Sequence, residues 1–178
     1  MGAWAGPFLI AALLLAVAGA AKVIDPTTTV GALRKLGLPA SATAVRVGGA
    51  VEVVLAVGAV LTGAPVLAGL VAVSYLLFTA FVLVALGRGL PIGSCGCFGK
   101  VDTPPSVLHV VVNLAAVAAA IGVALGDGTG IADVLADQPL AGVPFLLLVA
   151  VGGYAAFTAL TVVPQLRLLR ADRVEGTP

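Results

Sequence analysis

Five long apolar segments constrain this chain more than any other feature of its sequence. They lie at residues 4–21, 43–61, 66–86, 106–125 and 140–163. A helix needs about 20 apolar residues to cross the hydrocarbon core of a bilayer. Runs of Ala, Val, Leu and Gly without strand-length alternation favour helices, and open sheet edges are excluded from lipid. The sequence therefore predicts an all-α, polytopic membrane helix bundle with five transmembrane helices.

The composition agrees with this prediction. Hydrophobic residues make up 61% of the chain and charged residues 10%, against about 45–50% and about 25% in soluble globular domains. A chain of 178 residues is expected to form one domain, which we place at residues 1–170, with a short polar tail at 171–178. No basic residue precedes Lys22, so we predict a retained first span and not a cleaved secretory signal. The net charge of +1 gives no reason to expect nucleic-acid binding.

The first connection, residues 22–42, is predicted to contain a surface helix. Asp25-Pro26 and Leu38-Pro39 break the chain at its two ends. Between them, apolar side chains alternate with basic ones, as in a short amphipathic helix that lies on a membrane. The alternating residues are Val30, Leu33, Arg34, Lys35, Leu36 and Leu38.

All nine lysines and arginines fall on one side of a five-span chain. They occupy the first connection and its edges, the third connection and the tail: Lys22, Arg34, Lys35, Arg46, Arg88, Lys100, Arg167, Arg170 and Arg173. The positive-inside rule makes that side cytoplasmic and places the N-terminus outside. We therefore predict a multi-pass protein of the cell inner (plasma) membrane whose third connection faces the cytoplasm.

Glu52 is the acidic residue inside a predicted span, and an acid at such a position is a functional candidate. Five spans place it at the same level as Lys22, Arg46, Arg88 and His109. One interpretation makes Glu52 a buried partner of Lys22 or Arg46 that fixes helix packing. The other gives it a proton-transfer or ligand-binding role.

His109, one turn into the fourth span, also has two interpretations. It is either an interfacial histidine that reaches water or lipid head groups, or a proton donor or thiolate-stabilising neighbour of the third connection. Asp102 or Thr103, followed by Pro104, is expected to cap the fourth helix. The glycine pairs at 48–49 and 152–153 are expected where helices approach closely.

The third connection holds the only two cysteines, Cys95 and Cys97, with one glycine between them. As a redox pair they would form a small, strained disulfide that exchanges readily. As zinc ligands they would need His109 and Asp102 to complete a site, at a spacing typical of no zinc motif, so no metal site is predicted. As structural residues they would pack as small hydrophobes.

Three stretches resemble the MauE family of methylamine-utilisation membrane proteins, which is related to the DoxX-like membrane proteins. They are Cys-Gly-Cys-Phe-Gly at 95–99, Ala-Gly-Ala-Ala-Lys-Val-Ile-Asp-Pro at 18–26, and Val-Glu-Val-Val-Leu-Ala-Val-Gly at 51–58. The resemblance covers about residues 8–167 and implies a four-helix DoxX-like core plus one further helix.

The resemblance implies a membrane thiol–disulfide role, with Cys95 and Cys97 as the catalytic redox pair. MauE-like proteins are associated with maturation of methylamine dehydrogenase, an exported enzyme with a disulfide-rich small subunit, alongside a thioredoxin-like partner. The chain would then be a thiol–disulfide oxidoreductase or a subunit of one. Lys22 and Glu52 match the family pattern without an assigned role. The alternative is a non-catalytic membrane scaffold or a subunit of a small-solute transporter.

The sequence shows no cofactor motif. Because the chain has no second pair of cysteines, a quinone or a partner protein would have to accept the electrons of the first pair. Disulfide formation in exported proteins belongs to the oxidising side of the membrane, whereas the positions of the basic residues place Cys95 and Cys97 on the cytoplasmic side. The family and the charges thus give opposite expectations for the face that this pair serves.

Overall fold

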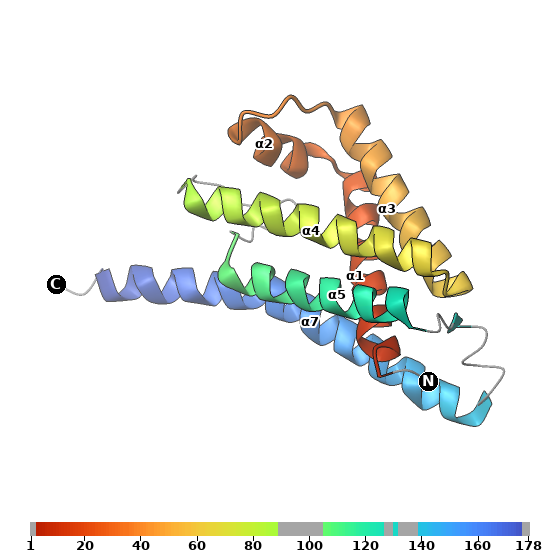
Figure 1. Ribbon diagram of the computed structural model, residues 1–178. Helices are drawn as coiled ribbons and strands as arrows, with labels where there is room; N and C mark the ends of the chain where they lie inside the picture. The colour runs from red at the N-terminus through yellow and green to blue at the C-terminus, as the bar shows by residue number, and fades with distance from the viewer. Residues whose placement is uncertain (1–2, 89–104, 127–129, 132–138, 176–178) are drawn as a thin grey trace.

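The computed structural model describes residues 3–88, 105–126, 130–131 and 139–175, and these are helical with no strand (Figure 1). The helices are α1 (Ala5–Ile24), α2 (Thr27–Lys35), α3 (Ala42–Thr62), α4 (Pro65–Gly87), α5 (Val107–Leu125) and α7 (Pro139–Glu175). The predicted all-α class is confirmed. The last predicted span forms part of the longer helix α7, which continues to Glu175.

Five of these helices are long and apolar enough to cross a membrane: α1, α3, α4, α5 and residues 142–163 of α7. Their ends lie within three residues of the predicted span ends. Large apolar side chains point outward along them, such as Val54, which is 71% exposed, and Leu77, which is 65% exposed. Side chains of this kind on the outer surface of a bundle match a lipid solvent. The prediction of a five-span membrane bundle is therefore confirmed.

Local sequence signals set the ends of α2, α3 and α4. Gly37 takes the left-handed conformation (φ 81°) after α2, and the Leu38 amide donates to the carbonyl of Leu33 at 3.1 Å, as in a Schellman motif. Ser41 then caps α3 by accepting a hydrogen bond from the Ala44 amide at 3.1 Å. Gly63, again left-handed (φ 62°), ends α3, and Pro65 starts α4 at once. The helix predicted in the first connection is present as α2.

The expected cap of α5 is wrong. Helix α5 begins at Val107, and Ser106 occupies the capping position in an extended conformation. Asp102 and Thr103 lie outside the described residues, and Pro105 and Ser106 are not helical, so neither Asp102 nor Thr103 can cap this helix. The Ser106 hydroxyl instead lies 2.9 Å from His109 Nδ1.

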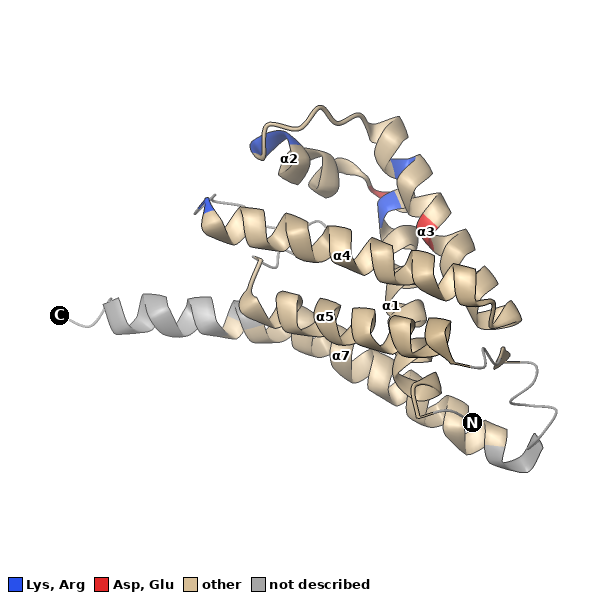
Figure 2. Cartoon of the chain, viewed as in Figure 1, with Lys and Arg blue, Asp and Glu red and all other residues tan. Residues whose placement is uncertain are grey.

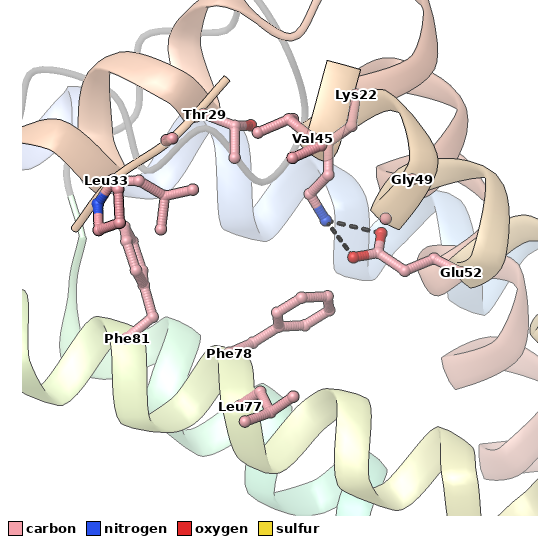
Figure 3. Close-up of a pocket in the computed structure, with 13 residues that line it drawn as sticks. Lys22, Thr29, Leu33, Val45, Gly49, Glu52, Leu77, Phe78 and Phe81 are labelled. Carbon is pink, nitrogen blue, oxygen red and sulfur yellow. Dashed lines mark hydrogen bonds and ion pairs between the residues drawn. The ribbon is translucent and has the colours of Figure 1, made fainter. Parts of the chain in front are cut away.

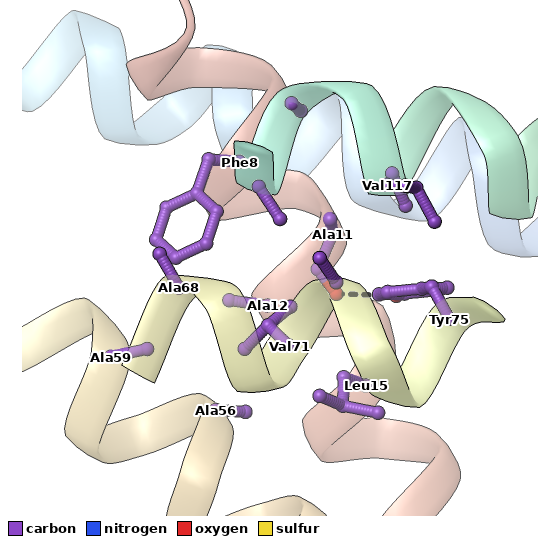
Figure 4. Close-up of a cluster of buried hydrophobic side chains, with 14 residues drawn as sticks. Phe8, Ala11, Ala12, Leu15, Ala56, Ala59, Ala68, Val71, Tyr75 and Val117 are labelled. Carbon is purple, nitrogen blue, oxygen red and sulfur yellow. Dashed lines mark hydrogen bonds between the residues drawn. The ribbon is translucent and has the colours of Figure 1, made fainter. Parts of the chain in front are cut away.

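Helix α1 passes through the centre of the bundle and packs most extensively on α3, while α4 packs on α5. Figure 1 shows α3 and α4 joined at their turn and diverging from it, with α2 beside the open end of the two helices. The main core combines two large aromatic residues, Phe8 and Tyr75, with many alanines and with the buried residues Leu15 and Val71 (Figure 4). At its centre, the Tyr75 hydroxyl donates to the backbone carbonyl of Ala11 at 2.6 Å and ties α4 to α1.

A close backbone contact between helices is made by two glycines, Gly19 of α1 and Gly49 of α3. A Cβ atom added at Gly49 would lie 2.6 Å from the Gly19 carbonyl oxygen, and one added at Gly19 would lie 2.5 Å from the Gly49 oxygen. Small residues permit such backbone approach in membranes. Of the first predicted glycine pair, only Gly49 makes this contact, since a Cβ at Gly48 would meet nothing within 4 Å.

The second predicted glycine pair lies where α7 packs on α1. A Cβ added at Gly152 would be 2.7 Å from the side chain of Ile10, and one added at Gly153 would be 2.8 Å from Leu13. Both positions therefore serve as helix contacts, as the sequence predicted.

Replacing Gly49 with alanine is expected to destabilise the protein, and the same change at Gly48 is not. Overpacking a tight contact costs about 1–3 kcal/mol, whereas Gly→Ala in an open helical position gains up to about 1 kcal/mol from helix propensity. Unfolding midpoints of the two variants in the same detergent measure the difference. Equal midpoints would contradict a tight α1–α3 crossing.

Candidate functional site

An ion pair inside the bundle joins Lys22 of α1 to Glu52 of α3. Lys22 Nζ donates to Glu52 Oε1 at 2.8 Å and to Oε2 at 2.6 Å (Figure 3). The side chains are only 9% and 15% exposed. A charged pair with both carboxylate oxygens engaged is the arrangement that makes buried charges tolerable in an apolar protein. Of the two partners that the sequence offered for Glu52, the structure shows Lys22.

The glycine contact explains why these two side chains meet. Lys22 follows Gly19 by three residues and Glu52 follows Gly49 by three residues, so each lies on the same helix face as its glycine. The two helices run in opposite directions. A Cβ added at Gly19 would lie 3.0 Å from Glu52 Cβ, and one added at Gly49 would lie 2.9 Å from Lys22 Cβ. The close crossing thus places each charged residue beside the glycine of the other helix.

Phe78 of α4 completes the surroundings of the pair. Lys22 Nζ lies 4.5 Å from the centre of the Phe78 ring, in cation–π geometry. The ring of Tyr75 meets Phe78 edge to face, with centroids 5.8 Å apart. Since Tyr75 is itself anchored to α1 through its hydrogen bond to Ala11, the position of Phe78 beneath the ammonium group is fixed by two helices.

The pair lies in an open pocket of about 340 Å³ between α1, α2, α3 and α4. Its walls are mainly apolar. Figure 3 shows Lys22 and Glu52 on one side of this space, Leu33 and Phe81 on another, and Phe78 and Leu77 below. A pocket of this size with apolar walls and a few convergent polar groups is typical of a small-molecule site.

Helix α2 covers one side of the pocket and is held there by two arginines. Arg34 Nε and Nη2 donate to the Ala40 carbonyl at 3.2 and 3.0 Å, and Arg88 Nη1 donates to the Leu36 carbonyl at 3.2 Å. Ala32 of α2 also packs against α4 beside Phe81. These contacts tie the surface helix to both α3 and α4.

His109 lies behind Phe78, away from the larger pocket. Its side chain is 3% exposed, so it does not reach the surface as an interfacial histidine would. Ser106 Oγ lies 2.9 Å from Nδ1, while Nε2 is buried without a hydrogen-bond partner among the described residues. With Phe78 and Asn113, His109 lines a small cavity of about 20 Å³.

The remaining predicted site residues are dispersed. Arg46 is exposed on α3, and Arg88 binds α2, as described above. Figure 2 shows the described lysines and arginines gathered around α2, the start of α3 and the ends of α1 and α4. Cys95 and Cys97 lie outside the described residues.

Sequence reasoning missed two residues that shape the site, Gly19 and Phe78. Gly19 carried a usable signal, because Gly-x-x-Lys at 19–22 repeats the spacing of Gly-x-x-Glu at 49–52. Phe78 carried none, since one phenylalanine in an apolar span is indistinguishable from its neighbours until the rotation of α4 is known.

Comparison with known proteins identifies the family. Residues 1–126 match the family described as "Methylamine utilisation protein MauE". The chain belongs to the MauE family. It is thus a membrane protein of a family associated with methylamine utilisation, as the three sequence stretches implied. No curated protein and no solved structure matches the chain.

The matched region contains the whole pocket. It ends at residue 126, directly after α5, so it includes Lys22, Glu52, Phe78 and the connection with the two cysteines. Helix α7 lies beyond it. The MauE family match therefore covers the residues that build the candidate site.

Replacing Lys22 with methionine is expected to cost about 3–5 kcal/mol, because it leaves the Glu52 carboxylate unpaired in apolar surroundings. The double variant Lys22→Met/Glu52→Met is expected to recover most of this loss. Arg46→Met is the control, since it removes the same charge at an exposed position, where changes are usually within about 0.5 kcal/mol. Denaturation in detergent measures all three variants. A Lys22→Met cost equal to that of Arg46→Met would contradict the ion pair.

Proposed function

We propose that this MauE-family chain is a membrane thiol–disulfide redox protein in which Cys95 and Cys97 form and break a disulfide. One observation carries the proposal. The only two cysteines of the chain are separated by a single residue, in the connection between α4 and α5 of a membrane bundle.

The short spacing favours exchange over structural stabilisation. A disulfide between these residues closes almost no loop, so it would stabilise the fold little. A small, strained disulfide is more oxidising and exchanges more readily with other thiols. When it forms, two S–H bonds break, one S–S bond forms, and two electrons and two protons leave for an acceptor. One cysteine would exchange with a partner and the other would resolve the mixed disulfide.

The basic end of the bundle supports a reactive thiolate. The connection leaves α4 at Arg88 and enters α5 at Ser106. Nearby cations and a helix N-terminus lower the pKa of a cysteine thiol. The gathering of described bases at this end (Figure 2) also supports a cytoplasmic orientation in the plasma membrane, by the positive-inside rule.

The expected partner is a thioredoxin-like protein, and the expected client is an exported, disulfide-rich enzyme such as methylamine dehydrogenase. The MauE family description supports the methylamine part of this proposal. The thioredoxin-like partner is what the resemblance to the MauE family implies.

Thiol trapping in native membranes tests the proposal. Acid quenching followed by a mass-adding maleimide is expected to show an oxidised pair that becomes labelled at both cysteines after dithiothreitol treatment. Cys95→Ser and Cys97→Ser are expected to differ, with one of them accumulating a mixed disulfide with a partner.

The alternative scaffold or transporter function makes the opposite prediction. Under it, the pair stays reduced in every condition, and Cys95→Ser/Cys97→Ser supports growth on methylamine as well as the native chain does. That combination would exclude the redox proposal.

The proposed orientation is tested with single cysteines in the Cys95→Ser/Cys97→Ser background. Gly31→Cys reports on α2, where an added Cβ meets nothing within 4 Å, and Thr62→Cys reports on the exposed turn at the opposite end of α3. An impermeant maleimide is expected to label Thr62→Cys in whole cells and Gly31→Cys only after lysis. The reverse pattern would contradict a cytoplasmic basic end.

A further inference from the structure

The Lys22–Glu52 pair gives the pocket one polar wall, and this wall carries no net charge. The ammonium and the carboxylate neutralise one another at 2.6–2.8 Å. An anionic ligand would compete with Glu52 for Lys22, and a cationic ligand would compete with Lys22 for Glu52. Either competition separates a largely buried pair, which is costly. The electrostatics therefore favour an uncharged ligand.

The pocket is accessible from the side of the bundle that faces lipid. Leu77 lines it and is 65% exposed, and Gly48, which also lines it, is exposed on α3. Both residues lie in helices long and apolar enough to cross a membrane. A ligand that dissolves in the bilayer can thus enter directly between the diverging helices α3 and α4.

The polar wall formed by Lys22 and Glu52 offers such a ligand both a hydrogen-bond donor and a hydrogen-bond acceptor. The Lys22 ammonium has three N–H groups. It makes two hydrogen bonds to Glu52. Each carboxylate oxygen of Glu52 has a further lone pair. A carbonyl oxygen can accept from Lys22, and a hydroxyl can donate to Glu52. The two phenyl rings of Phe78 and Phe81 provide flat apolar walls.

We propose that this pocket binds the head group of a lipid-soluble quinone. The quinone is uncharged, flat and membrane-soluble, and it carries carbonyl oxygens that accept from Lys22. Its reduced form, the quinol, carries hydroxyls that donate to Glu52. The same polar wall therefore suits both redox states of the ligand. The pocket volume of about 340 Å³ lies within the range of small-molecule sites.

The redox part of this inference rests on the proposed thiol–disulfide function. Two thiols lose two electrons and two protons and become one disulfide. The quinone gains two electrons and two protons and becomes a quinol with two new O–H bonds. The quinone would thus be the acceptor that a chain with a single cysteine pair lacks.

Photolabelling with an azido-substituted benzoquinone tests the site in the full chain in lipid nanodiscs. Labelled peptides are expected from α3 and α4, and decyl-ubiquinone is expected to compete. Gly48→Leu places a large side chain in the pocket, where an added Cβ meets nothing within 4 Å. Because this side chain takes up space that the ligand would occupy, binding is expected to weaken about tenfold, which is about 1.4 kcal/mol.

Gly69→Leu is the matched control, because Gly69 is a helical glycine of α4 with equally open surroundings and is not among the residues that line this pocket. Its labelling is expected to equal that of the native chain. Labelling that decyl-ubiquinone does not reduce, or that Gly48→Leu leaves unchanged, would overturn the site. Equal displacement by oleate or phosphatidylglycerol would overturn it as well, since the occupant would then be a lipid.

The cysteine variant separates this inference from the proposed function. Photolabelling of Cys95→Ser/Cys97→Ser is expected to match the native chain, because the pocket residues are unchanged. Quinone binding without thiol oxidation would contradict the proposed redox function and would still support the binding site. Thiol oxidation by decyl-ubiquinone at the same rate in Gly48→Leu as in Gly69→Leu would overturn the electron-acceptor role of the pocket.

Discussion

The close crossing of α1 and α3 is the contact on which the candidate site depends. Gly19 and Gly49 let the two backbones approach until a single Cβ would clash with a carbonyl oxygen. At that distance Lys22 and Glu52, each three residues farther along its helix, pair through both carboxylate oxygens. The Phe78 ring of α4 then packs against the Lys22 ammonium of this pair. Packing of small residues, which drives helix association in lipid, here also decides where charge can be placed.

The neutrality of this charged pair links it to the chemistry proposed for the chain. A lone acid or a lone base in a span would attract ions or headgroups, whereas the pair leaves hydrogen-bonding capacity without net charge. The divergence of α3 and α4 keeps that capacity open to the bilayer, and Arg34 and Arg88 hold α2 over it. The MauE family match covers residues 1–126, which include both the pocket and the connection with the two cysteines.

Much of the fold could be predicted from hydropathy. A membrane span must make its backbone hydrogen bonds within itself, so it appears in the sequence as one continuous apolar helix. The five spans follow from this constraint, whereas the surface helix α2 was predicted from the alternation of apolar and basic residues between two chain breakers. Glu52 and Lys22 stood out because charge is rare in a span, but their pairing needed the register of α1 against α3. Phe78 and the burial of His109 depended on helix rotation, which uniformly apolar spans leave undetermined. The capping residue of α5 was predicted wrongly, because Ser106, and not the earlier Asp102 or Thr103, takes the capping position.

The ion pair also bears on how the chain enters the membrane. Lys22 and Glu52 are 30 residues apart, so Lys22 is synthesised before its acidic partner. Until α3 arrives, the Lys22 side chain can extend toward the interface from the end of α1, as long basic side chains do. In the folded protein the ammonium lies beside the Glu52 carboxylate, and α2 occupies the connection between the two helices. The surroundings of the Lys22 side chain are thus complete only when the second transmembrane segment supplies Glu52.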